Sequence, residues 1–199
     1  MPTATPRPAA SVIPLRRGGK HAERGLEVLL LKRSELASFM PGVWVFPGGA
    51  VDPEDGEGET GFRACALREL IEEASIGLDG PDQLVPFSHW ITPEIVPVRF
   101  DTWFYLALAP AHSTPEPDGS ETTEAAWWEP RLSLKAHRDG ELELVFPTIK
   151  QLESLLAHAT SEEALEAVRG RPVEAIHPKV IGEGDGRRVV LPGEPGYQG

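Results

Sequence analysis

The chain has 199 residues, of which 40% are hydrophobic and 25% are charged, and its formal net charge is −12 at pH 7. The composition is ordinary for one globular domain, whereas the acidic balance disfavours nucleic acid or an anionic membrane as a partner, because both require a basic surface. No apolar run approaches the length of about 18 residues that marks a membrane span, and no secretory leader is visible. We therefore expect a cytoplasmic protein without membrane contact.

Residues 1–9 are rich in proline and threonine, and we expect a flexible lead-in there. Short runs rich in apolar, branched or aromatic residues then predict strands. The expected strands are residues 11–16, 26–32, 43–46, 84–91, 98–109 and 124–128, with Pro130 closing the last. A glycine turn is expected within residues 17–25.

A central helix is expected from Thr60, which offers a capping side chain, to about Ser75. Its packing stripe has four-residue spacing and consists of Phe62, Ala66, Leu70 and Ala74. Capping signals at Thr148 and Thr160 predict two more helices. Together these elements predict an α/β fold over residues 10–177, an α/β/α sandwich with a mixed central sheet and extra C-terminal helices. The glycine-rich residues 178–199 fit a hairpin or a disordered tail equally well.

The stretch from Phe46 to Leu78 carries the strongest chemical signal. It contains Gly48 and Gly49, an acidic loop at residues 52–59, and then the acidic part of the central helix. Glu69, Glu72 and Glu73 have the spacing i, i+3 and i+4 and share one helical arc about 100° wide. Carboxylates crowded in this way repel one another and are typical of a site for a hard cation such as Mg²⁺ or Mn²⁺. The alternative is a solvated acidic face with an ordinary Arg68–Glu72 pair, and the preceding glycine turn favours the metal.

This stretch resembles the signature of the Nudix hydrolases. That signature reads Gly, five residues, Glu, seven residues, then Arg-Glu-apolar-any-Glu-Glu-any-Gly-apolar. Gly49 opens the match, and residues 68–74 follow it without a gap as Arg-Glu-Leu-Ile-Glu-Glu-Ala. The chain departs from the signature in two places. Ser75 replaces its last glycine, and the segment before Arg68 is longer, which leaves Glu59, with Glu57 second, as the early signature glutamate.

The resemblance implies a Nudix sandwich and a hydrolase that cleaves the diphosphate of a nucleoside diphosphate linked to another moiety. It also implies Mg²⁺ or Mn²⁺ as cofactor, and an arginine, here Arg68, that orients the glutamates. The metal ligands implied in this chain are Glu69, Glu72, Glu73 and Glu59. A downstream carboxylate often completes such a site or acts as the base. Glu121 and Glu124 are the candidates, and either is equally well a plain loop acid.

Residues 29–49 are also similar to an extra motif of the Nudix enzymes that cleave coenzyme A. The spacing fits, but Leu31 replaces a threonine and Ser38 replaces the second arginine of that motif. Residues 89–93 and 99–105 resemble the peroxisomal acyl-CoA diphosphatase branch, and the likeness extends over residues 11–165. CoA or acyl-CoA is therefore the favoured substrate. The alternatives are an enzyme for ADP-ribose, a dinucleotide or a nucleotide-sugar, and a nucleotide-sensing module without activity.

Substrate contacts are expected at Arg33, Gly48, Gly49 and Arg99, with the two arginines meeting phosphates. The alternatives are a solvated strand-end charge for Arg33 and an ion pair with Asp101 or another neighbour for Arg99. Aromatic residues of the strands, Trp90, Trp103 and Phe104, either stack on an adenine or belong to the core. Cys65, the single cysteine, excludes an internal disulfide and is expected to be buried. The partner is a small nucleotide, and the choice between a monomer and a homodimer stays open.

Overall fold

The computed structural model describes residues 4–18, 25–37 and 40–197. Its main sheet has eight strands: β1 (Arg7–Arg16), β2 (Glu27–Arg33), β3 (Trp44–Val45), β4 (Gly48–Ala50), β5 (Val85–Ile91), β6 (Phe100–Leu108), β7 (Thr122–Trp128) and β8 (Ala175–Ile176). The order is β3-β2-β1-β6-β5-β8, with β4 paired to β1 and β7 paired to β2. The helices are α1 (Gly58–Ala74), α2 (Pro130–Arg138), α3 (Phe146–Leu155) and α4 (Ser161–Val168).

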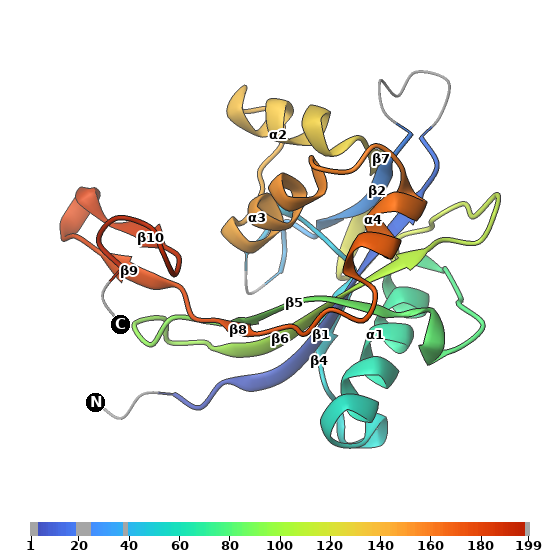
Figure 1. Cartoon of the computed structure of the whole chain (residues 1–199), viewed down its shortest axis with the longest axis horizontal. Helices are drawn as coiled ribbons and strands as arrows, with labels where there is room; N and C mark the ends of the chain where they lie inside the picture. The colour runs from blue at the N-terminus through green and yellow to red at the C-terminus, as the bar shows by residue number, and fades with distance from the viewer. Residues whose placement is uncertain (1–3, 19–24, 38–39, 198–199) are drawn as a thin grey trace.

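Helices cover both faces of the sheet, with α1 on one side and α2 and α3 on the other (Figure 1). The alternation of side chains along β2 divides the core accordingly. Val28 and Leu30 face the cluster that contains α2, α3 and α4, whereas Leu29 and Leu31 face the cluster that contains α1. Two apolar cores therefore lie against one mixed sheet, which is the predicted α/β/α sandwich.

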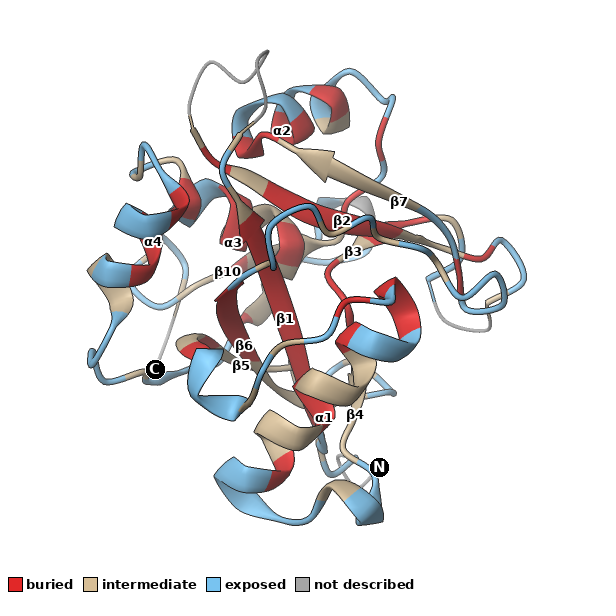
Figure 2. Ribbon diagram, turned by 90° about the vertical axis from the view of Figure 1, so that its right-hand side faces the viewer, coloured by how far each residue is buried: buried red, intermediate tan, exposed pale blue. Residues whose placement is uncertain are grey.

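The central strand β1 begins at Arg7, so the expected lead-in of residues 1–9 ends earlier than predicted. Residues from Arg7 onward pair in parallel with β6, starting at Phe100, and the strand also pairs with β4. Figure 2 shows β1 buried along most of its length. The proline and threonine content of residues 1–9 suggested a loose lead-in, but the pairing of the strand with β6 outweighs that local preference.

The structure differs from the sequence-based expectation in three helix starts. Pro130, expected only to close a strand, lies in the first turn of α2, where its missing N–H costs nothing. The central helix begins at Gly58 with Glu57 as its N-cap, before Thr60, and α3 begins before Thr148 with Pro147 in its first turn. The expected cap at Thr160 is confirmed, since its side chain accepts a hydrogen bond from the Glu163 N–H at 3.1 Å.

The C-terminal residues form the hairpin alternative, with β9 (Lys179–Ile181) antiparallel to β10 (Arg188–Val190). Val190 is fully buried, and Leu191 packs against the cluster that contains α2 to α4. The expected turn at residues 17–25 lies mainly outside the described residues, as does Ser38. Among the helices in the described ranges, none is both long enough and apolar enough to cross a bilayer.

Candidate active site

The C-terminal half of α1 lies against the glycine strand β4. The backbone N–H of Gly48 donates a hydrogen bond to Glu73 Oε2 at 2.8 Å, and only 4% of Glu73 is exposed. A Cβ on Gly48 would lie 2.5 Å from the carbonyl oxygen of Ala10, and one on Gly49 would lie 2.2 Å from Glu69 Oε1. Both glycines are therefore required by close approach, one to β1 and the other to a carboxylate of α1.

Three carboxylates share this region. Burial raises the pKa of Glu73 to about 8, although the Gly48 N–H acts against it, and the charges of Glu69 and Glu121 add to the rise. Burial also raises the pKa of Glu69, with Glu121 again contributing. Glu121 precedes β7, and its backbone carbonyl accepts a hydrogen bond from the Ser34 N–H at 2.8 Å. Carboxylates from α1 and from a loop far along the chain thus lie close together.

Arg68 joins the carboxylates of α1 to the acidic loop. Its Nη1 donates to Glu69 Oε1 at 2.8 Å and to Glu72 Oε2 at 3.0 Å, while its Nη2 donates to Asp55 Oδ2 at 2.8 Å and to the Ala50 carbonyl at 3.1 Å. The hydrogen bond from Arg68 holds the pKa of Asp55 below its ordinary value. A planar guanidinium with all of these partners fixes the directions of Glu69 and Glu72.

A second set of hydrogen bonds holds the loop that carries Glu121. Asp118 accepts hydrogen bonds from the backbone N–H groups of Ser120, Glu121 and Thr122 at 2.6, 2.7 and 3.0 Å. Burial alone would raise the pKa of Asp118, but these bonds and those from the Ser120 and Thr122 hydroxyls hold it well below its ordinary value. The Thr122 hydroxyl also lies 3.2 Å from the carbonyl oxygen of Glu73, which connects the loop to α1.

Arg33 reaches the same site from the end of β2. It lies opposite Thr122 in the sheet, and its charge acts to lower the pKa of Glu73. The structure therefore brings together Arg33, Gly48, Gly49, Arg68, Glu69, Glu72, Glu73 and Glu121 among the predicted residues.

The other predicted site residues engage different partners. Glu59 lies in the first turn of α1 and pairs with Arg63 at 3.0 Å; it is ten residues from Glu69, or about 15 Å along a helix axis. Glu124 pairs with Lys32 at 3.0 Å. Arg99 donates to the carbonyl oxygens of Thr92 and Ala4 at 3.0 and 2.8 Å, so its contacts are to backbone. The structure does not bring Glu59 or Arg99 to Glu69, Glu72 and Glu73.

The donor set suits a hard divalent cation, although the side chains are not arranged around one. Within the described ranges, no three His, Cys, Asp or Glu side chains are gathered closely enough to hold a metal ion. Arg68 and the Gly48 N–H instead engage Glu69, Glu72 and Glu73. Buried carboxylates with raised pKa values nevertheless provide the oxygen ligands and the uncompensated charge that Mg²⁺ or Mn²⁺ satisfies. The residues therefore fit the expected cofactor by their chemistry.

Sequence reasoning missed two supporting acids, Asp55 and Asp118. The role of Asp118 could have been predicted, because Asp-Gly-Ser is typical of a turn in which the aspartate accepts backbone hydrogen bonds. The role of Asp55 could not, since its link to Arg68 depends on how the acidic loop folds back on α1.

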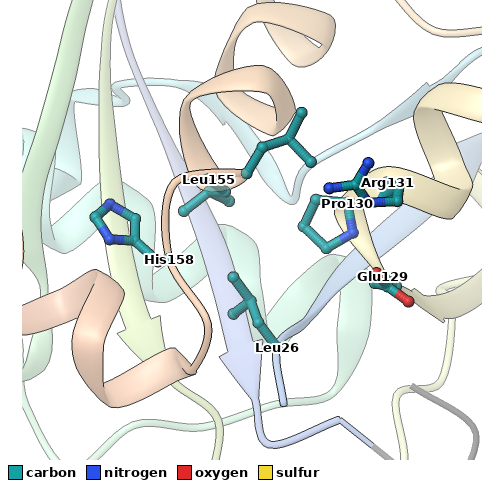
Figure 3. A pocket seen from close by; sticks show the side chains of 7 residues that line it. Leu26, Glu129, Pro130, Arg131, Leu155 and His158 are labelled. Carbon is teal, nitrogen blue, oxygen red and sulfur yellow. The ribbon is translucent and has the colours of Figure 1, made fainter. Parts of the chain in front are cut away.

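A separate small cavity lies in the core that contains α2 to α4 (Figure 3). It is lined by Leu26, Glu129, Pro130, Arg131, Leu155, Leu156 and His158, and its volume of about 10 Å³ is the room for a single water. Both carboxylate oxygens of Glu129 are buried without a hydrogen-bond partner in the part of the chain that the structure describes. The cavity involves none of the predicted site residues.

An α/β/α sandwich that holds a helix of glutamates against a glycine strand is the arrangement that the resemblance to the Nudix hydrolases implied. The NUDIX domain model matches residues 5–146, so the chain belongs to the Nudix family. The crystal structure of a NUDIX hydrolase from Alicyclobacillus acidocaldarius superimposes with a TM-score of 0.74 at 28% identity, covering 86% of this chain and all of that one. This likeness confirms the predicted fold.

Of two further relatives, one is a longer protein and the other has a lower sequence identity. A putative nudix hydrolase 7 of Caenorhabditis elegans is 31% identical over 162 residues, which are 64% of this chain and 55% of that protein, so the chain spans about half of its relative. The NUDIX domain of Shewanella oneidensis NrtR, solved with ADP ribose, has a TM-score of 0.57 at 17% identity and covers 77% of this chain and 88% of that one. The second comparison shows a common fold alone.

Proposed function

We propose that this protein is a Mg²⁺- or Mn²⁺-dependent hydrolase that cleaves the diphosphate of a nucleoside diphosphate linked to another moiety. The observation that carries the proposal is the pair of carboxylates Glu69 and Glu73 beside the glycine strand, whose pKa values burial raises, with the exposed Glu121 acting on both. Membership of the Nudix family supports it. A solvated acidic face would show neither the burial of Glu73 nor its hydrogen bond to Gly48.

The bound cation would neutralise phosphate charge and lower the pKa of a bound water. In our proposal Glu69, Glu72 and Glu73 are its ligands, and Arg68 is a positioning residue that sets the directions of the first two. Burial raises the pKa of Glu73 to about 8, so Glu73 would give up a proton on binding the cation.

The remaining carboxylate acts on the attacking water. The oxygen of this water forms a bond to one phosphorus while the bond from that phosphorus to the bridging oxygen breaks. The proton of the water passes to an oxygen of the carboxylate. We assign that role to Glu121, because its charge acts on both Glu69 and Glu73, whereas Glu124 is occupied by Lys32. Arg33 is the proposed phosphate contact.

CoA or acyl-CoA is the substrate that we favour, with adenosine 3′,5′-bisphosphate and a phosphopantetheine as products. The motif at residues 29–49 supports this choice. Leu36, 94% exposed on the loop that follows Arg33, adds an apolar side chain there that suits a substrate with an apolar portion. The alternatives are ADP-ribose, a dinucleotide or a nucleotide-sugar, and a sensing module that binds a nucleotide without cleaving it.

One assay separates these alternatives. The protein is incubated with Mg²⁺ and CoA, an acyl-CoA, ADP-ribose or NADH, and the products are separated by chromatography. Turnover restricted to CoA and its ester supports our choice. A preference for ADP-ribose or NADH instead assigns the protein to the enzymes that act on ADP-ribose, a dinucleotide or a nucleotide-sugar. Binding without any turnover would contradict the proposed hydrolase and identify a sensor.

A further inference from the structure

A second pocket lies at the opposite end of α1 from the carboxylates. Its lining residues come from α1, β5, β6 and the segment after α4: Glu59, Phe62, Pro86, Trp103, Tyr105, Arg171 and Val173. The volume is about 220 Å³, against about 10 Å³ for the single-water cavity beside Glu129. In Figure 1 the chain after α4 runs along the sheet toward β8, which pairs with β5, and Arg171 and Val173 of this segment line the pocket.

Aromatic rings form the walls of this pocket, and their neighbours hold them in place. Trp103 stacks on His89, with ring centres 4.5 Å apart and planes 14° from parallel. Phe62 and Tyr105 lie next to Trp103, at 6.2 and 6.3 Å between ring centres. His89 in turn contacts the carboxylate of Asp101. The stacking with His89 holds Trp103 in place, so this aromatic wall of the pocket is preformed.

Tyr105 contributes a polar group to this pocket. Only 1% of the residue is exposed, but its hydroxyl is not among the atoms that are fully buried without a hydrogen-bond partner in the described part of the chain, and the residue lines the pocket. A hydroxyl that faces the pocket can donate a hydrogen bond to a ligand there. Burial raises the pKa of Tyr105 to about 12, so at neutral pH the hydroxyl keeps its proton and can donate it. A ligand with a hydrogen-bond acceptor would satisfy it.

Charged groups stand at the rim. Arg171 is exposed and lines the pocket, and no side-chain partner of its guanidinium is found among residues 4–18, 25–37 and 40–197. Glu59 also lines the rim, but its carboxylate is paired with Arg63, which covers the face of Tyr105 at 5.3 Å from the ring centre. The cation that remains for a ligand is therefore Arg171, and it suits an anionic substituent.

We propose that this pocket binds a planar aromatic ring that presents a hydrogen-bond acceptor to Tyr105 and an anionic substituent to Arg171. The site is separate from the proposed active site, because Glu59 and Glu69 are ten residues apart on α1, about 15 Å along its axis. The pocket is smaller than the ~300–1,000 Å³ of sites for drug-sized ligands. It therefore holds the ring alone, while the charged substituent stays at the rim.

The test is calorimetric titration of the full chain, in the presence of a metal chelator, with adenosine monophosphate and separately with indole-3-acetate. Both probes combine a bicyclic ring with an anion, and they distinguish a nucleotide from an aromatic acid as the source of that chemistry. We expect Tyr105→Phe to weaken binding about 2- to 10-fold, the range for one lost hydrogen bond. Arg171→Gln should weaken it as well, and magnetisation transfer from the ligand to the Trp103 ring should be seen by NMR.

Matched variants control for general damage. Tyr197→Phe removes the hydroxyl of the chain's other tyrosine, which bonds to the His177 carbonyl outside the pocket, and Arg169→Gln removes an arginine next to the lining segment. Neither should change the affinity, and Glu73→Gln should leave it unchanged too. Binding of either probe with this pattern supports the site. Absence of binding by both probes up to about 1 mM, or binding lost in Glu73→Gln and kept in Tyr105→Phe, would overturn it without affecting the proposed hydrolase.

Discussion

At the scale of single residues, Glu73 combines features that rarely occur together. Its carboxylate is almost completely buried, it is bonded to the backbone of the glycine strand, and its pKa is raised to about 8. Perturbed carboxylates of this kind concentrate at functional sites. Two predictions follow from its surroundings, one on catalysis and one on stability.

Replacing Glu73 by glutamine keeps the shape and the acceptor for the Gly48 N–H but removes the charge that a cation needs. We expect Glu73→Gln to lower kcat at least about 100-fold, the upper end of the range for disturbed metal sites, while circular dichroism stays unchanged. Steady-state kinetics with the substrate found in the panel provide the measurement. Glu166→Gln, an exposed glutamate of α4, is the matched control and should be fully active; an active Glu73→Gln enzyme would refute the metal assignment.

The same carboxyl group predicts how stability depends on pH without metal. In the folded protein Glu73 keeps its proton up to about pH 8, whereas in the unfolded chain it loses it near pH 4.5. The native state therefore binds more protons between these values, and the free energy of unfolding falls as the pH rises from about 5 to about 8. Urea unfolding in chelator measures this decline, which should be smaller in Glu73→Gln, where Glu69 still contributes in the same direction. An equal decline in both proteins would contradict the assigned pKa.

At the scale of elements, the acidic loop and the end of α1 decide how the glutamates are held. Much of this could be predicted from the sequence. The glutamate arc and the glycine turn are local patterns, and the strands β2, β5, β6 and β7 follow from their apolar runs. The helix α2 and the roles of Asp55 and Asp118 could not be predicted in this way, because they depend on contacts between segments that no local pattern reports.

Asp55 is expected to matter although it lies outside the signature helix. Asp55→Asn removes the charged partner of Arg68, so the guanidinium no longer holds Glu69 and Glu72 in fixed directions. We expect a 10- to 100-fold loss of activity or of metal affinity, the usual cost of disturbing groups behind metal ligands, with a higher Mg²⁺ concentration at half-maximal rate. Glu54→Gln, on an exposed residue of the same turn, should behave like the parent protein. A normal Mg²⁺ response in Asp55→Asn would show that Arg68 does not need this partner.

Ser75 ends α1 in the left-handed conformation, with φ 54° and ψ 29°. The Nudix signature has glycine at this position, and only glycine adopts such angles without steric cost. We expect Ser75→Gly to raise the free energy of unfolding by about 0.5 kcal/mol, as the relieved strain exceeds the added entropy of the unfolded chain. Ser154→Gly, within α3, should instead lower it by about 0.5–1 kcal/mol. Denaturant unfolding measures both, and a destabilised Ser75→Gly variant would contradict this account.

At the scale of the whole molecule, the C-terminal hairpin belongs to the core. Val190 of β10 is fully buried, while its neighbour Val189 is partly exposed. Val190→Ala should lower the free energy of unfolding by about 1–3 kcal/mol, because it removes buried methyl groups and leaves a cavity. Val189→Ala, the same change one residue earlier, should cost less than about 1 kcal/mol. Equal effects on the unfolding midpoint would show that the hairpin is only loosely attached.

The position of β1 has a consequence for how the protein is made. This strand lies between β2 and β6, and its parallel partner begins at Phe100, far along the chain from Arg7. Because β1 precedes β6 in the chain, on the ribosome β1 waits with one edge unpaired until β6 has been synthesised. Contacts between distant segments form slowly, so both hydrophobic layers of this domain complete late in its synthesis, and a strand edge left open in this way is a site where a chaperone would bind.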